Sequence, residues 1–369
     1  MAKHFYRNIL LVALLTVMGG CQSVEYLSID YLLPAEVSFP PSLKRVAVVN
    51  NMPDTPDRQM ADDDTSKEKK GGNEAMHITR YYDGNATLAT EVLAESIADV
   101  NYFDEVAICD SALRKMDITP RESTLTSDEV EQLTRELDVD FLIAVENVQM
   151  RAIRKVESIS PYGNAYLGTI DLKVCPSVSV YLPGRKGPMV TLNTCDSIYW
   201  EEVGNSVAYT GSRLISEKEM VRQGSEFAGT VPVRRLLPYW KTADRYLFTN
   251  GSVNMRDAAI YVKEKNWEEA IKLWKQVYQH KKGKQKMYAA YNLALGYELQ
   301  DSIGPALEWA RKAQAEALKV DKVEEKKSAE GVYAEDVPNY LLTSLYVTEL
   351  EKRQESITRL KMQMQRFEP

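Results

Sequence analysis

The sequence predicts an N-terminal domain of the α+β or α/β class, with a small mixed sheet and an antiparallel hairpin, followed by an all-α array of helical hairpins. Three observations predict this organisation. Short β-branched runs alternate with helical patterns over residues 43–148, residues 170–200 sort into two faces as a hairpin requires, and residues after 252 repeat at a fixed offset. With 369 residues, the chain is long enough for two domains that each bury a core.

The first residues have the order of a bacterial secretory signal. Lys3 and Arg7 precede an apolar run at residues 9–18, and Gly19 and Gly20 follow it. A run of about ten apolar residues has the length of a signal-peptide core and is too short to span a bilayer. We therefore expect residues 1–20 to be a signal peptide.

Cys21 follows the small residues directly, and this order resembles the lipobox of bacterial lipoproteins. The resemblance implies that the Cys21 thiol is acylated, that residues 21–42 are a lipid tether, and that the protein is an outer-membrane lipoprotein. Met18 stands where the family prefers Leu. A cleaved signal without lipid and an uncleaved anchor are the alternatives. A single acidic residue, Glu25, among the four after Cys21 favours a periplasm-facing protein over one exposed at the cell surface.

The charge balance excludes one class of partner. The chain has 46 basic and 53 acidic side chains and a formal charge of -7. Without residues 1–20, which contain two basic side chains and no acidic one, the charge is -9. A chain this acidic, with no basic stripe, repels phosphate backbones, so we expect no nucleic-acid partner.

Residues 43–245 are expected to form the α/β domain, because apolar runs alternate in them with segments of helical periodicity. The expected elements are a strand at 43–50, a helix at 85–100, a strand at 105–109, a helix at 126–137 and a strand at 140–148. Thr126 and Glu129 have the spacing of a capping box at the second helix. Residues 51–83 are rich in charge, Pro and Gly, and we expect them to be a mobile insertion.

A half-buried antiparallel hairpin is expected over residues 170–200, with its turn at 183–187. If the numbers of paired residues sum to 370, apolar pairs such as Ile170 with Trp200 share one face and polar pairs share the other. A slip of one residue would mix the two faces, so the pattern indicates one register.

This register places Cys175 opposite Cys195. In an oxidising envelope the two cysteines are a disulfide candidate. Pro176 lacks an N–H and should therefore occupy a non-hydrogen-bonded site of the ladder. Its neighbour Cys175 is then at a hydrogen-bonded site, where the geometry is less favourable for a cross-strand disulfide. Two packed free thiols and a metal site are the alternatives.

Residues 246–369 resemble tetratricopeptide repeats. Ala258 and Ala270 recur 36 positions later as Ala294 and Ala306, and each pair has the spacing of twelve that is typical of the motif. A third, degenerate copy is expected at 340–367. The small residues let the two helices of each repeat approach closely.

The resemblance implies a partner-binding groove on the concave face of the array. It assigns eight side chains to this groove: Met255, Ala259, Val262 and Lys263 from the first repeat, and Tyr288, Tyr291, Leu295 and Glu298 from the second. A short array often packs this face on its own domain, which is the alternative.

Residues of the types that carry catalysis are sparse. After Cys21 the chain has two histidines, His77 and His280, so there are no paired histidine ligands and no Ser/His/Asp or Cys/His set. No glycine-rich phosphate motif stands between a strand and a helix. We therefore expect no enzyme activity, no metal site and no cofactor.

As a whole, the chain resembles a family of envelope lipoproteins typical of Bacteroidota, in which an α/β domain of unknown function precedes tetratricopeptide repeats. The stretches LKRVAVVNN at 43–51 and RRLLPYW at 234–240, together with the repeat, carry this resemblance. It implies a lipid-anchored, non-enzymatic protein-binding or scaffold protein with another envelope protein as partner. The α/β layout is also similar to the periplasmic domain of the curli-secretion lipoprotein, which gives a subunit of an oligomeric secretion or transport assembly as the alternative.

Overall fold

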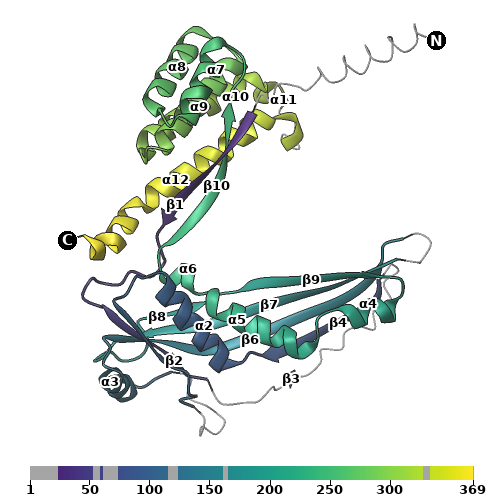
Figure 1. Ribbon diagram of the computed structural model, residues 1–369, viewed down its shortest axis with the longest axis vertical. Coiled ribbons are helices and arrows are strands. Elements are labelled where there is room, and N and C mark those ends of the chain that lie inside the picture. The colour runs from purple at the N-terminus through teal and green to yellow at the C-terminus, as the bar shows by residue number, and fades with distance from the viewer. Residues whose placement is uncertain are drawn as a thin grey trace, which may run out of the picture. The chain divides into compact units, whose positions relative to one another are not determined.

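The chain divides into two compact units (Figure 1). The structure, a computed structural model, describes residues 24–52, 59–60, 74–114, 124–160, 165–326 and 333–368. The sheet unit contains the described residues of 34–239 and 361–368, and the helical unit contains those of 24–33 and 240–360. The N-terminal end of the described chain thus belongs to the helical unit, and its C-terminal end belongs to the sheet unit.

Two long strands form the centre of the sheet unit. β6 (Phe141–Ser158) and β7 (Tyr166–Tyr181) pair antiparallel along almost their full length. On the other side of β6 lie β2 (Arg45–Asn50), which is parallel to it, and β4 (Glu74–Asp83), which is antiparallel. The remaining strands are β5 (Glu105–Cys109) beside β2, β3 (Gln59–Met60) beside β4, and β8 (Val190–Asn193) and β9 (Asp196–Gly204) beside β7.

Helices cover the two faces of this sheet unequally. The helices of the unit are α2 (Ala86–Asp99), α3 (Ser127–Glu136), α4 (Val207–Arg213), α5 (Glu217–Thr230) and α6 (Val233–Leu236). Along β2, Val46 and Val48 join the core beneath α2 and α5, whereas Ala47 and Val49 join the core beneath α3. The parallel part is therefore buried on both faces, which explains its unbroken apolar sequence.

The expected parallel strands are confirmed, with the order β5, β2, β6. The hairpin register is also confirmed, since Ile170 pairs with Trp200 and Val178 with Leu192. The expectation of a mobile insertion at residues 51–83 was wrong for residues 74–83, which form β4. Their apolar and aromatic residues pack along the far half of β6, which runs ten residues beyond the expected end at 148. Residues 53–58 and 61–73 of that segment lie outside the described residues.

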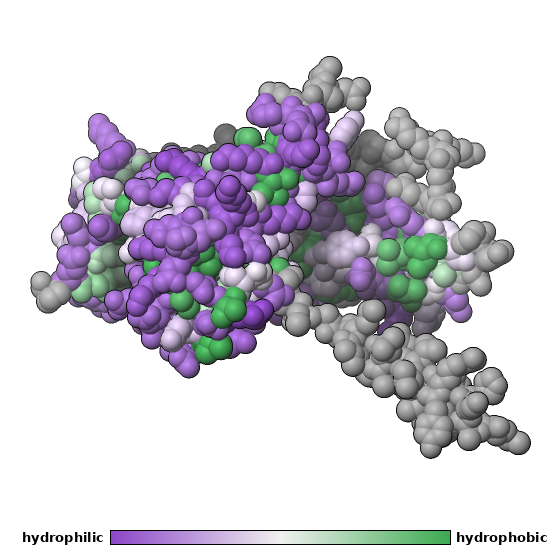
Figure 2. Space-filling model, turned by 90° about the horizontal axis from the view of Figure 1, so that it is seen from above, coloured by the Kyte–Doolittle hydropathy of each residue, from purple (hydrophilic) through white to green (hydrophobic). Residues whose placement is uncertain are grey.

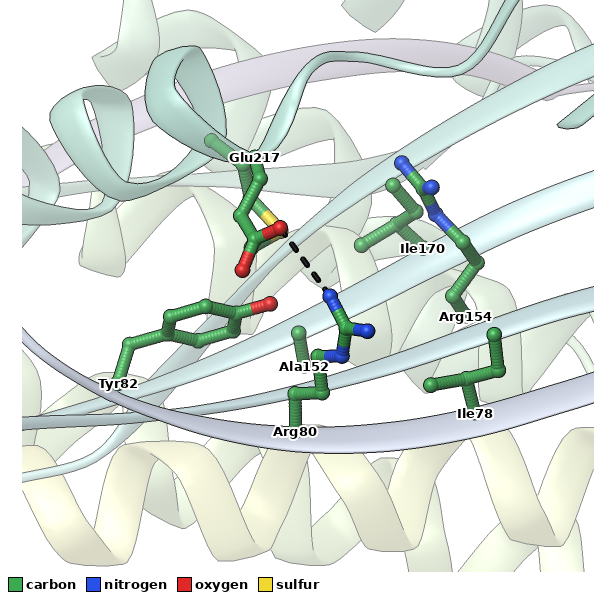
Figure 3. A pocket seen from close by; sticks show the side chains of 8 residues that line it. Ile78, Arg80, Tyr82, Ala152, Arg154, Ile170 and Glu217 are labelled. Carbon is green, nitrogen blue, oxygen red and sulfur yellow. Dashed lines mark hydrogen bonds and ion pairs between the residues drawn. The ribbon is translucent and has the colours of Figure 1, made fainter. Parts of the chain in front are cut away.

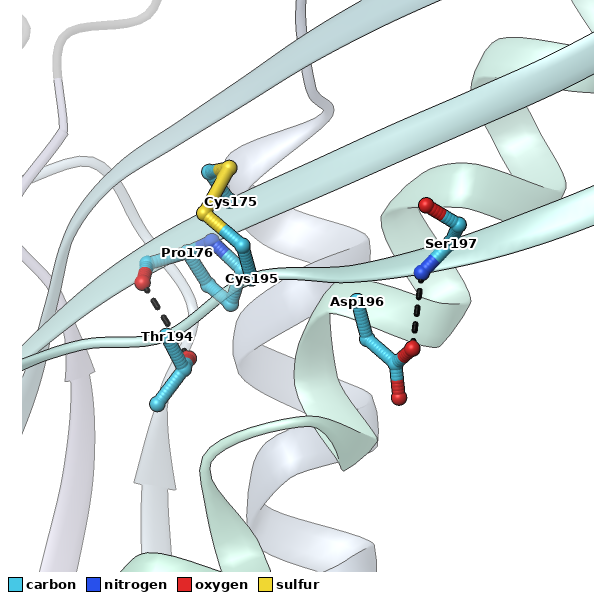
Figure 4. The surroundings of a disulfide bond; sticks show 6 residues. All are labelled: Cys175, Pro176, Thr194, Cys195, Asp196 and Ser197. Atoms are coloured by element: carbon cyan, nitrogen blue, oxygen red, sulfur yellow. Dashed lines mark hydrogen bonds between the residues drawn. A yellow bond between two sulfur atoms is a disulfide. The ribbon is translucent and has the colours of Figure 1, made fainter. Parts of the chain in front are cut away.

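The hairpin register brings Cys175 and Cys195 together, and the structure joins them in a disulfide (Figure 4). Their Cα atoms lie 4.2 Å apart. Next to the bridge, Thr194 donates from its backbone N–H and its hydroxyl to the carbonyl oxygen of Pro176, at 3.1 and 3.3 Å. The bridge therefore holds Thr194 and Cys195, which connect β8 to β9, against β7.

The helical unit begins with a two-stranded ribbon of β1 (Val24–Leu33) and β10 (Tyr239–Phe248). Ser28 Oγ donates to Asp244 at 2.7 Å and Thr242 Oγ1 donates to Asp30 at 2.6 Å. In both pairs the residue numbers sum to 272, which indicates an antiparallel register. The expected lipid tether at 21–42 therefore contains a strand. Its alternating sequence VEYLSIDYLL fits this role, but the partner strand is more than 200 residues away.

Helices make up the rest of this unit. They are α7 (Val253–Lys263), α8 (Trp267–His280), α9 (Lys284–Glu298), α10 (Ile303–Val320), α11 (Val323–Lys326) and α12 (Pro338–Met364), with 3-10 turns at Ala334–Asp336 and Gln365–Phe367. The alanines of the repeat, Ala258, Ala270, Ala294 and Ala306, are all fully buried. They allow α7 to pack on α8 and α9 on α10 at short range.

The expected third helical hairpin at 340–367 is absent from the described residues, because α12 is one continuous helix of 27 residues. No Gly or Pro interrupts it after Pro338, so nothing in its sequence ends the helix early.

Seen from above, hydrophilic residues cover most of the face in view, and hydrophobic residues form only small separate patches (Figure 2).

Replacing both Cys175 and Cys195 by Ser should lower the free energy of unfolding of the sheet unit by about 2–4 kcal/mol, because the bridge closes a loop in the unfolded chain. Urea unfolding followed by circular dichroism measures this loss. Cys109→Ser, at a free cysteine, is the control and should cost less than about 1 kcal/mol. Equal losses in the two variants would contradict a stabilising role for the bridge.

Candidate functional site

The expected groove residues lie on α7 and α9, but they do not form an open groove. Six of the eight are buried: Met255, Ala259, Val262, Tyr291, Leu295 and Glu298. Tyr288 is half-buried and Lys263 is exposed. The expectation of an open partner-binding groove was therefore wrong for this set. Cys21 lies outside the described residues.

The chain's own ribbon fills this face. The ring of Phe248, the last residue of β10, stacks on Tyr288 with centroids 3.9 Å apart and meets the edge of Tyr291 at 5.3 Å. Asn292 donates to the Phe248 carbonyl at 2.7 Å and accepts from the Phe248 N–H at 3.0 Å. The end of β10 therefore occupies the place where the repeat resemblance puts a ligand.

A buried charge network holds the ribbon, the repeat helices and α12 together. The carboxylate of Glu298 on α9 is fully buried. Arg245 of β10 donates to both of its oxygens, at 2.9 and 3.0 Å, and Tyr346 of α12 donates to it at 2.6 Å. Arg353 of α12 also donates to Glu298. Two guanidinium groups and a hydroxyl thus compensate this buried carboxylate.

Glu349 of α12 extends the same network. It forms ion pairs with Arg245 and with Lys241, each at 3.0 Å, and accepts a hydrogen bond from Tyr31 of β1. Burial alone would raise its pKa, but Tyr31, Arg245 and Lys241 together lower the pKa of Glu349 to about 2. Glu349 therefore stays charged in neutral and mildly acidic solution and keeps β1 and β10 bound to α12.

The repeat pattern indicates Glu298 but not the partners of its carboxylate. Arg245 and Arg353 lie 53 and 55 positions away from it. One signal could have found Arg245: in β10 it takes the inward place between Ala243 and Leu247, where an unpaired charge would be unfavourable. An inward Arg in an alternating strand indicates a buried acidic partner.

Along the outer edge of β1 the helical unit has a cleft of about 530 Å³. Residues 28–32 form one wall. The facing wall is one side of α12 and the turn between α9 and α10. The residues of these elements that line the cleft are Arg353, Ser356, Ile357 and Leu360 of α12 and Leu299, Asp301 and Ile303 near the turn. The α12 residues have the spacing of a single helix face, so the cleft runs between a strand edge and a helix.

The strand edge in this cleft is open. Among the described residues, β1 pairs with β10 alone, so its second edge has no strand partner. Five consecutive residues of β1 line the cleft, which means that the backbone itself faces it. Trp240 is also part of the lining and is 70% exposed. The arrangement offers a row of backbone donors and acceptors beside a helix face with both polar and apolar side chains and an exposed aromatic ring.

The sheet unit has a smaller cavity of about 110 Å³ (Figure 3). Arg80 of β4 donates to Glu217 at the start of α5 at 3.2 Å, and Arg154 donates to the carbonyl of Ile215 at 2.9 Å. Burial and the neighbouring Glu217 raise the pKa of Tyr82 to about 12. The cavity has room for only a few water molecules, and both arginines already have hydrogen-bond partners in its wall, so it is too small to hold an extended ligand.

Within the described ranges, no three His, Cys, Asp or Glu side chains converge as a metal site would require. The helices of that same part of the chain include none that is both apolar enough and long enough to cross a membrane. Among the described residues, the cleft along β1 combines a strand edge with a helix face and an exposed aromatic ring.

Comparison with known families gives two matches. Residues 43–248 match the family described as a domain of unknown function (DUF8603), and residues 256–352 match a second domain of unknown function (DUF6340). The first match covers the sheet from β2 onward together with β10, and the second covers most of the helices that follow the ribbon. Searches of curated proteins and of solved structures find no match.

Glu298→Ala should lower the free energy of unfolding of the helical unit by about 3–5 kcal/mol, because two buried guanidinium groups would lose their shared carboxylate. The matched control is Glu325→Ala, which removes an ion pair between exposed side chains and should cost less than about 1 kcal/mol. Urea unfolding curves of the two variants give the comparison. A small effect at Glu298 would show that the network contributes little to stability.

Proposed function

We propose that this chain, which belongs to the family of the domain of unknown function DUF8603, is a lipid-anchored, non-enzymatic protein-binding protein of the bacterial cell envelope. The cleft along the open edge of β1 carries this proposal. The partner is an extended segment of another envelope protein, bound as an added strand beside β1. The helix pairs α7/α8 and α9/α10 are tetratricopeptide-like repeats that support the ribbon.

Two observations support the envelope location. The sequence of residues 1–21 resembles a lipoprotein signal that ends in an acylated Cys21. The sheet unit contains the disulfide between Cys175 and Cys195, and such bonds persist in oxidising compartments such as the periplasm. The protein would be anchored in the outer membrane and face the periplasm.

Strand addition fits the geometry of the cleft better than binding through side chains alone. An open strand edge binds an extended peptide through backbone hydrogen bonds, while alternate side chains of the peptide enter pockets beside the strand. Residues 28–32 span about 17 Å, which is the length of a five-residue strand. Ile303, Ile357 and Leu360 offer apolar contacts for the peptide side chains that face α12.

The charges of the cleft narrow the choice of partner. Asp30 and Asp301 are part of its lining, and the side chain of Asp301 is 91% exposed. Arg353 is already paired with the buried carboxylate of Glu298, which it shares with Arg245, and with Asp301 at 3.7 Å. Acidic side chains of a partner would therefore meet like charge. The cleft fits a segment with apolar residues at alternate positions and neutral or basic residues between them.

The anchor is tested by Cys21→Ala. The variant should move from the membrane fraction to the soluble fraction and lose labelling by a radioactive fatty acid, because the thiol that carries the lipid is gone. The wild-type chain is the reference, and Cys109→Ser, which removes a different unbridged thiol, should stay in the membrane fraction. Continued labelling of the Cys21→Ala chain would show that Cys21 is not the acylated residue.

The cleft is tested by Ser356→Trp, which fills it from the α12 side. Peptides selected from a library of random sequences for binding to the Cys21→Ala chain should bind the filled variant at least about tenfold more weakly, because two or more backbone hydrogen bonds are lost. Thr358→Trp is the matched control. It lies on the same helix but points away from the cleft side, and it should leave the affinity unchanged.

Methylation of the peptide backbone distinguishes strand addition from other modes of binding. Two versions of the peptide are compared, one with N-methyl groups on its odd-numbered residues and one with them on its even-numbered residues. One version should lose binding and the other should keep it, because only alternate N–H groups face the neighbouring strand. Equal binding of both versions would contradict strand addition. Self-association of the chain in place of peptide binding would favour a subunit of an oligomeric secretion or transport assembly.

A further inference from the structure

We infer that the end of the helical unit where β1 begins lies against the lipid headgroups, with Tyr26 at the membrane interface. The inference rests on acylation of Cys21 in the proposed function and adds which surface of the folded chain contacts the bilayer. The occupant of this surface is the headgroup layer of the membrane that holds the lipid.

The first argument is the length of chain between the lipid and the fold. Only Gln22 and Ser23 separate Cys21 from Val24, the first residue of β1. Three residues of extended chain span at most about 11 Å. The headgroup layer on each side of a bilayer is itself about 5–8 Å thick. A lipid on Cys21 therefore holds the start of β1 at the membrane surface.

The second argument is that the start of β1 is fixed to the helical unit. Glu25 forms an ion pair with Lys263, at the end of α7, at 3.3 Å. The ring of Tyr26 lies 5.0 Å from the ring of Tyr246 on β10. Ile29 and Tyr31, further along the strand, are buried in the core of the unit. The lipid is thus joined to a folded body, and that body must approach the membrane with this end first.

The third argument is the chemistry of the outer face of the ribbon. Tyr26 is 65% exposed and, with Tyr246, places two phenol rings at the end near the lipid. Tyrosine is enriched at membrane interfaces, because its ring is apolar and its hydroxyl stays hydrated. The next pairs on this face, Ser28 with Asp244 and Asp30 with Thr242, are hydrophilic. The contact is therefore shallow and confined to the beginning of β1.

Trp240 provides an internal control. It lies on the same outer face of the ribbon, opposite Leu32 in the register that pairs Asp30 with Thr242, and it is 70% exposed. Leu32 follows Tyr26 by six positions along the strand, a distance of about 20 Å. Two aromatic side chains of similar exposure therefore differ in their distance from the lipid.

The experiment uses the acylated mature chain in vesicles of phosphatidylcholine and phosphatidylglycerol. Tyr26→Cys and Trp240→Cys, each combined with Cys109→Ser, receive a fluorescent label on the new thiol. A quencher attached to the lipid headgroups should reduce the fluorescence of the label at 26 and not of the label at 240. Iodide in the water should quench in the opposite order.

Equal quenching of the two labels in vesicle-bound protein would overturn the inference and leave the lipid anchor intact. Failure of the acylated chain to float with the vesicles would overturn the anchor, and the inference with it. Two further measurements allow these outcomes to be interpreted. Thermal unfolding checks that both labelled variants are folded, and hydrogen exchange on the unlabelled chain should show slower exchange at residues 24–26 when vesicles are present.

Discussion

The buried carboxylate of Glu298 is the interaction on which the architecture of the helical unit depends. It accepts hydrogen bonds from Arg245 on β10 and from Tyr346 and Arg353 on α12, so three segments that are distant in sequence share one acceptor. A buried charge is tolerated only when its partners are in place. The ribbon, α9 and α12 therefore form one arrangement, and the loss of any of them leaves a charge without compensation.

This arrangement determines which surfaces of the helical unit are exposed. In an open array the concave face takes a ligand, but here Phe248 and the inward residues of the ribbon occupy that face. The ribbon in turn exposes a strand edge, which an array of helices does not have. This edge presents backbone groups in place of side chains, and strand edges of this kind bind extended segments through main-chain hydrogen bonds in many proteins.

The sequence was most informative where contacts are local. The register of the hairpin at 170–200 follows from the period of two, because one slip would place Asp171 and Lys173 in the core. The same reasoning could not pair β1 with β10. Both strands alternate between inward and outward residues, but no local sequence pattern indicates that residues 216 positions apart are paired. The repeat motif identified Tyr291 and Leu295 as important, but motif residues look the same whether a ligand or the chain's own strand lies against them. The charge network needed both Arg245 and Arg353, which are remote from Glu298, and only the fold brings them together.

The position of β1 also has a consequence for biosynthesis. It is the first element of the described chain to leave the ribosome, but its partner β10 follows only after the whole of residues 34–238 has been made. Closing so long a loop adds little to the entropic cost, which grows only with the logarithm of loop length, but it delays the pairing. Until then β1 has two open edges, and both can pair with other chains. The outward Ser28 and Asp30 make the unpaired strand more hydrophilic, which lowers its tendency to pair with other chains before β10 has been made.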